Sequence, residues 1–86
     1  MEWGEVAQRI YSTLKENDYG YLVDQMVHEY GIGGTPGEMF SIVCHWLAGL
    51  RNTGNPAFEF VREDAERLFR MGYDLNYFTK DSLSKI

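Results

Sequence analysis

The chain has 86 residues, 44% of them hydrophobic and 15% aromatic, and it contains one cysteine. This apolar content excludes an intrinsically disordered chain, and the length predicts a single domain over residues 1–86. A single cysteine cannot form an internal disulfide. Thirteen acidic against eight basic side chains give a net charge of −5, which disfavours nucleic acid and anionic membranes as partners.

The net negative charge is concentrated in the first half of the chain, and no segment is net basic. A secretory signal, with a basic segment before an apolar one, is not found near residue 1. The most apolar run, residues 39–50, is shorter than the roughly 20 residues that span a bilayer. It contains the lone Cys44, and a free cysteine suits a reducing compartment. We therefore expect a cytoplasmic protein that does not enter a membrane.

The first predicted helix covers residues 2–16, where apolar side chains recur at spacings of three and four. The apolar positions are Trp3, Val6, Ala7, Ile10 and Leu14. Charged and polar side chains fill the other face, so the helix is amphipathic. Asn17 and Asp18 interrupt the pattern, and either residue is expected to cap the next helix.

The second predicted helix covers residues 19–30 and is again apolar on one face. That face holds Leu22, Val23, Met26, Val27 and Tyr30. Gly31 suits the left-handed position that ends a helix, and we expect Ile32 to fold back onto Val27.

The third predicted helix, residues 36–52, is the most apolar segment of the chain. Between residues 39 and 50 only a serine and a histidine carry polar side chains. Thr35 is a good N-cap, Glu38 stands at the capping-box position, and Gly54 suits the end of the helix. Because a helix that is apolar on every side is buried, we expect this one to be central.

Residues 56–71 predict a fourth helix that Asn55 caps, that starts at Pro56 and that ends at Gly72. Its outer face carries acidic and basic side chains at a spacing of four, and Glu66 and Arg70 are one expected pair. The short connection after the third helix predicts that these two helices are antiparallel neighbours.

The tail, residues 73–86, stays rich in aromatic and aliphatic side chains, so we expect it to pack back on the bundle. Thr79 is a suitable cap for a short fifth helix over residues 80–85. No segment alternates as a strand would. The predicted fold is therefore all-α, a small bundle of four main helices with the third one central. A domain this small leaves a homodimer open.

The residues that could carry chemistry lack the spacing that metal binding or catalysis needs. Cys44 and His45 are adjacent, so on a helix their side chains point roughly 100° apart. No basic residue close in sequence would activate the thiol. The glycine-rich residues 31–37 have neither the lysine nor the preceding strand of a phosphate-binding loop. We predict no catalytic residue, metal or cofactor. We expect Cys44 to lie in the core and His45 to form a hydrogen bond in or beside it.

Two alternative functions stay open. Residues 22–50 have the outline of a helix-turn-helix, which would make the protein a DNA-binding regulator. Against this, the second of these helices offers apolar side chains where contacts to bases need polar ones. The other alternative is a small-ligand binder or an enzyme with Cys44 and His45 in a pocket, completed by a group from another helix.

The six tyrosines and the acidic first half favour a different function. Tyrosine combines apolar area with a polar tip and is enriched at protein interfaces. We predict a contact surface formed by Glu16, Asp18, Tyr19, Tyr21 and Asp24. The preferred function is a small acidic, non-catalytic interaction module that acts as an adaptor, inhibitor or antitoxin-like partner of a basic protein.

Overall fold

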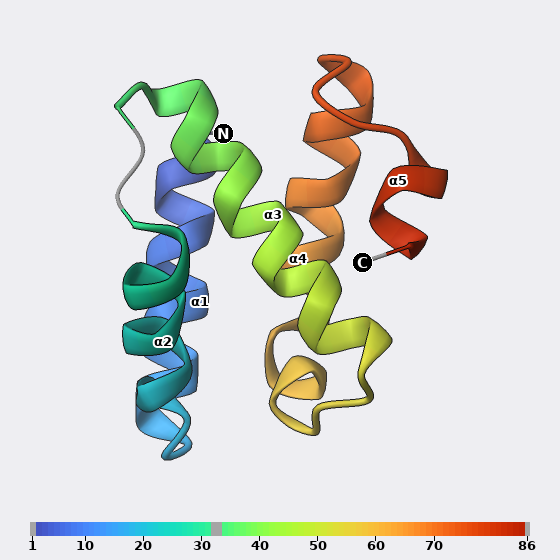
Figure 1. The fold of residues 1–86 in the computed structure, drawn as a ribbon. Helices are drawn as coiled ribbons and strands as arrows, with labels where there is room; N and C mark the ends of the chain where they lie inside the picture. The colour runs from blue at the N-terminus through green and yellow to red at the C-terminus, as the bar shows by residue number, and fades with distance from the viewer. Residues whose placement is uncertain (1, 32–33, 86) are drawn as a thin grey trace.

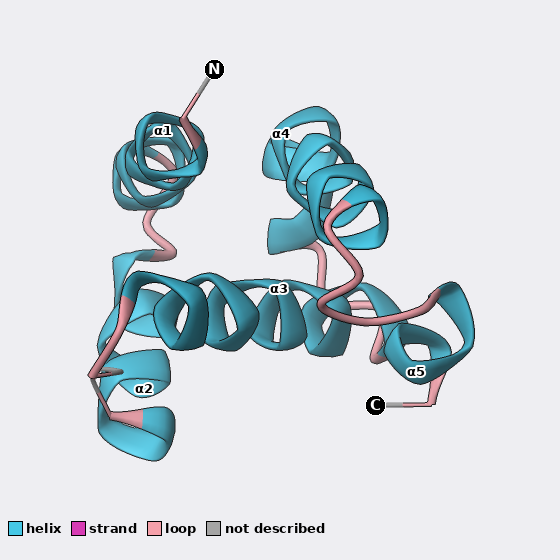
Figure 2. Ribbon diagram, turned by 90° about the horizontal axis from the view of Figure 1, so that it is seen from above, coloured by secondary structure: helices cyan, strands magenta, loops and turns pink. Residues whose placement is uncertain are grey.

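A computed structural model describes residues 2–31 and 34–85, which form five helices and no strand. The helices are α1 (Trp3–Glu16), α2 (Gly20–Tyr30), α3 (Pro36–Asn52), α4 (Ala57–Asp74) and α5 (Lys80–Ser84). Helices α1 and α4 lie side by side in one layer and run in opposite directions (Figure 1). Helix α3 crosses beneath them, with α2 at one end and α5 at the other (Figure 2). The predicted all-α bundle with a short fifth helix is confirmed.

Helices α3 and α4 supply the two largest sets of buried residues. Those of α3 are Phe40, Val43, Cys44, Trp46, Leu47, Ala48 and Leu50. The Phe40 ring centroid lies 5.5 Å from that of Trp3 on α1. One stripe of α3, with Ile42 and His45, is only half-buried. The helix is central as predicted, but it is not enclosed on every side. The other four helices are too few to cover its whole circumference.

Three helices end in the same way, with a left-handed residue just after the last turn. This residue is Asp18 after α1 (φ 66°), Gly54 after α3 (φ 70°) and Asn76 after α4 (φ 61°). In each case the next backbone N–H donates to a carbonyl of the last turn, as in a Schellman motif. The Tyr19 N–H, for example, donates to the Leu14 carbonyl at 2.7 Å.

The prediction that Asn17 or Asp18 caps α2 was wrong. Asn17 belongs to the end of α1, where its Nδ2 donates to the Thr13 carbonyl at 2.8 Å. Asp18 takes the left-handed position, and the N-cap of α2 is Tyr19, whose side chain makes no capping hydrogen bond. The chain reverses too tightly between the two helices for either side chain to reach forward. The expected contact of Ile32 lies outside the described residues.

The start of α3 agrees with the sequence in one half of the capping box. Thr35 Oγ1 accepts a hydrogen bond from the Glu38 N–H at 3.1 Å. The Glu38 carboxylate accepts from the Gly34 N–H at 3.1 Å, whereas a complete box would use the N–H of Thr35 itself. At the start of α4, Asn55 Oδ1 accepts from the Ala57 N–H at 2.9 Å.

The C-terminal segment packs back on the bundle, as predicted. Phe78 and Leu83 are both buried, and the Leu83 carbonyl accepts from Asn52 Nδ2 at 2.8 Å. The prediction that Gly72 ends the fourth helix was wrong, since α4 continues to Asp74. Gly72 is needed for packing instead: a Cβ there would lie 2.0 Å from Cζ of Phe78.

The described helices include none that has both the length and the apolar character needed to cross a membrane. Their core consists of hydrophobic residues, and no polar or charged residue within the described ranges is buried.

Candidate interaction surface

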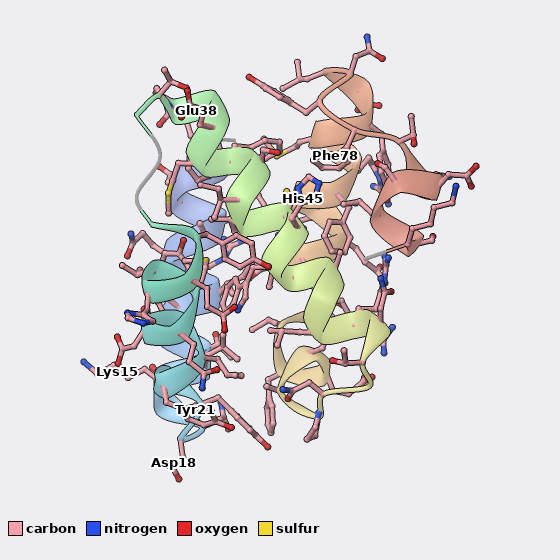
Figure 3. The ribbon with its side chains drawn as sticks, in the orientation of Figure 1. Lys15, Asp18, Tyr21, Glu38, His45 and Phe78 are labelled. Carbon is pink, nitrogen blue, oxygen red and sulfur yellow. The ribbon has the colours of Figure 1, made fainter. Side chains whose placement is uncertain are left out.

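The five predicted contact residues lie around the turn between α1 and α2. This turn forms one end of the molecule, where Asp18 and Tyr21 are labelled (Figure 3). Four of the five side chains are exposed, and Tyr19 is half-buried. Short local sequence separation explains why they lie close together, and it does not by itself make them a binding surface.

The structure brings two of these residues together with a third that the sequence did not single out. The ring centroid of Tyr19 lies 6.3 Å from that of Tyr21 and 5.8 Å from that of Phe60 on α4. Tyr21 and Phe60 are 53% and 51% exposed, so the three rings form a continuous aromatic surface. We call Tyr19, Tyr21 and Phe60 the aromatic end.

Phe60 could have been noticed in the sequence, but its partners could not. The apolar face of α4 includes Phe58 and Val61, and Phe60 falls outside it among charged side chains. A large aromatic residue on the polar face of a helix is an unusual signal. Contact with Tyr19, however, depends on how the start of α4 packs beside the α1–α2 turn.

Acidic residues adjoin the aromatic end in the sequence. Glu16 and Asp18 come from the turn, and the exposed Glu59 and Glu63 flank Phe60 along α4. The hydrogen bond from Arg62 lowers the pKa of the Glu59 carboxyl below its ordinary value, and the positive charge of Arg62 offsets the charge of this carboxylate. The charge of the whole chain has the same bias, since residues 1–50 contain seven acidic and two basic side chains.

Asp24 belongs to a neighbouring feature of the surface. It lines a hollow of about 300 Å³ between α1 and α2. The other lining residues are Tyr11, Lys15, Gly20 and Val23. Lys15 therefore lines this hollow together with Asp24. The predicted set thus divides into an acidic aromatic end and a separate groove.

Cys44 and His45 occupy different environments. Cys44 is fully buried, and burial raises the pKa of its thiol to about 12, which keeps the thiol protonated and unreactive at neutral pH. His45 lies at the half-buried surface beside Phe78 (Figure 3). Its Nδ1 lies 2.7 Å from the Ser41 carbonyl oxygen. Since a carbonyl oxygen can only accept, Nδ1 is the donor of this hydrogen bond. The predictions of a core cysteine and a hydrogen-bonded histidine are confirmed.

A hollow of about 400 Å³ does adjoin His45, lined by Tyr30, Glu38, Ser41 and Ile42 as well. It lacks the buried thiol, so the two residues of the proposed catalytic pair do not meet in it. Within residues 2–31 and 34–85, no three His, Cys, Asp or Glu side chains are grouped as metal ligands.

The outward stripe of α3 also bears on the DNA-binding alternative. A recognition helix presents polar or basic side chains to the major groove. The outward side chains of α3 include Glu38, Ile42 and His45, whereas Phe40, Val43 and Leu47 are committed to the core. The carboxylate of Glu38 would repel the phosphate backbone.

Comparison of the chain with protein-family models, curated proteins and solved structures gives no match.

Proposed function

We propose that the protein is a small acidic interaction module that binds a basic protein segment through its aromatic end. The observation that carries this proposal is the contact of Tyr19, Tyr21 and Phe60, with two of the three rings about half exposed. Such a cluster leaves apolar area in water that a partner would cover. Tyrosine in particular is among the residues that contribute most to binding energy at interfaces.

The surrounding charge indicates the chemistry of the partner. Lys and Arg side chains are attracted by carboxylates and also by the faces of tyrosine and phenylalanine rings. A basic segment could therefore place its cations near Glu16, Asp18 and Glu63 while its alkyl groups cover the rings. Charge complementarity of this kind raises the association rate and favours one class of partner over others.

The proposal is tested by titrating the ¹⁵N-labelled protein with a short peptide rich in Lys, Arg and Leu. We expect saturable chemical-shift changes in residues 16–21 and 59–63. We also expect Tyr21→Ser to weaken binding about tenfold, the effect of losing roughly 1.4 kcal/mol at an interface residue. Raising the ionic strength should lower the affinity, because exposed charges are screened by salt.

Tyr30→Ser is the matched control. Tyr30 is on the same helix and is 46% exposed, but it lies at the other end of α2, away from the aromatic end. Its replacement should leave the affinity unchanged. An equal loss in Tyr30→Ser, or shift changes spread over all acidic residues, would show general charge attraction and would rule out the proposed surface.

A further inference from the structure

A hollow of about 450 Å³ lies where α3, α4 and α5 meet. Its lining residues are Arg51, Glu66, Phe69, Arg70, Tyr73, Asp74 and Lys80. This volume is within the range of roughly 300–1,000 Å³ that is usual for small-molecule sites. The hollow includes no residue of the aromatic end, so it is independent of the function proposed above.

Three cationic side chains line this hollow, and each comes from a different helix. Arg51 belongs to α3, Arg70 to α4 and Lys80 to α5. Two of them lie over aromatic rings. Cζ of Arg51 is 5.1 Å from the ring centroid of Phe69, and Nζ of Lys80 is 5.9 Å from that of Tyr73. Contacts of this kind orient the cations before any ligand arrives.

Two hydrogen bonds also fix Arg51, and they use only some of its N–H donors. Its Nε donates to Asn52 Oδ1 at 3.0 Å, and its Nη2 donates to the Leu83 carbonyl at 3.3 Å. A guanidinium has five N–H donors in a planar arrangement. Three donors of Arg51 therefore take no part in hydrogen bonds among the described residues.

Arg70 has acidic neighbours but pairs with none of them. Glu66 precedes it by four residues and Asp74 follows it by four, positions that allow ion pairs on a helix. The four ion pairs among the described residues include neither Glu66–Arg70 nor Arg70–Asp74. The pair predicted between Glu66 and Arg70 does not form, and the Glu66 carboxylate lies 4.0 Å from Nη1 of Arg62.

We propose that this hollow binds a small molecule through a phosphate group. A phosphate ester offers three oxygens and a charge near −2, and Arg and Lys are the residues that bind it. Three cations from three helices match this ligand better than a carboxylate, which one guanidinium can satisfy with two parallel hydrogen bonds. The half-buried ring of Tyr73 offers apolar contact for the organic part of the ligand.

Two carboxylates also line the hollow, and their charge predicts how one substitution changes the affinity for phosphate. Asp74 and Glu66 oppose a bound anion, so the site is weaker than its three cations alone would make it. Replacing Asp74 with asparagine keeps the side-chain shape and removes one negative charge. Asp74→Asn should therefore bind phosphate severalfold more tightly than the wild-type chain.

The test is a titration of the ¹⁵N-labelled protein with inorganic phosphate at constant ionic strength and pH 7.5. We expect saturable shifts at residues 51, 70, 73 and 80. Arg70→Gln should weaken binding about tenfold, the effect expected for losing one charge-assisted contact. Arg67→Gln is the control, since Arg67 is on the same helix and pairs with Asp64 outside the hollow.

Two further controls, acetate as the ligand and the variant Asp81→Asn, distinguish a phosphate site from general attraction of anions. Acetate at the same ionic strength should cause much smaller shifts, and Asp81→Asn should leave the affinity unchanged. Equal responses to acetate and phosphate, equal losses in Arg67→Gln and Arg70→Gln, or shifts that do not saturate would each overturn the proposal. None of these results would affect the aromatic end, which is tested with a cationic probe.

Discussion

Asp18 and Asn76 share a backbone conformation that most residues avoid. Both have φ above 60° at the end of a helix, where Gly54 takes the same role after α3. The left-handed conformation costs an ordinary L-residue roughly 1–2 kcal/mol, and less for Asn and Asp, whose short polar side chains bond locally. Glycine avoids this cost but loses more freedom on folding, by about 0.4–1 kcal/mol. The first effect outweighs the second by at most about 1 kcal/mol.

We expect Asp18→Gly and Asn76→Gly each to raise the free energy of unfolding by up to about 1 kcal/mol. Urea denaturation followed by circular dichroism measures both changes. The two variants should differ in binding: only Asp18→Gly should weaken the complex with the basic peptide. A loss of stability in Asp18→Gly would mean that its carboxylate makes a stabilising contact in the native protein.

At the scale of helices, Gly72 shows how packing can reverse a local preference. Glycine inside a helix is less favourable than alanine by roughly 1 kcal/mol, and a sequence pattern therefore treats it as an end. Here the missing Cβ makes room for the Phe78 ring. That ring also contacts Phe40 and Tyr73, with centroids 6.3 and 5.5 Å away. The contact fixes the C-terminal segment against α3 and α4.

Gly72→Ala should therefore lower the free energy of unfolding by about 1–3 kcal/mol, as expected for an overpacked site. Gly4→Ala is the matched control, since Gly4 is also helical and a Cβ there would meet nothing within 4 Å. That change should stabilise the protein, or leave it unchanged, by thermal denaturation. A stabilising effect of Gly72→Ala as large as that of Gly4→Ala would show that the Phe78 contact is absent in solution.

For the whole molecule, the buried hydrophobic residues form one continuous cluster. It extends from Val6 on α1 to Leu83 on α5 and includes Leu47, which is fully buried. A core shared by all helices predicts that they unfold in one cooperative step, as most small domains do.

Leu47→Ala tests this cooperativity, because it should lower the free energy of unfolding by about 2–5 kcal/mol. The fluorescence of Trp46, measured in a Trp3→Phe background, reports on α3, and far-ultraviolet circular dichroism reports on all helices. Both probes should give the same loss. Transitions at different denaturant concentrations would mean that part of the bundle unfolds separately.

The sequence by itself determined the helices, because helix formation depends on contacts three and four residues apart. Apolar spacing predicted α1 to α4, Thr79 correctly marked the start of α5, and the aliphatic tail predicted its return to the core. Short-range chemistry also placed Thr35 at the start of α3, whereas the prediction that Asn55 caps α4 was wrong by one residue, since its N-cap is Pro56. The same reasoning failed at Asp18 and Gly72, where the geometry of the next segment decides which residue ends a helix.

Only the tertiary structure decided what the surface offers. Phe60 meets Tyr19 across about forty residues of sequence, and Arg51, Arg70 and Lys80 meet only where three helices converge. Such groupings depend on how the helices cross, which is set by the sum of many side-chain contacts and leaves no local pattern. The predicted turn contains Tyr19 and Tyr21, and only the packing of α4 brings Phe60 beside them.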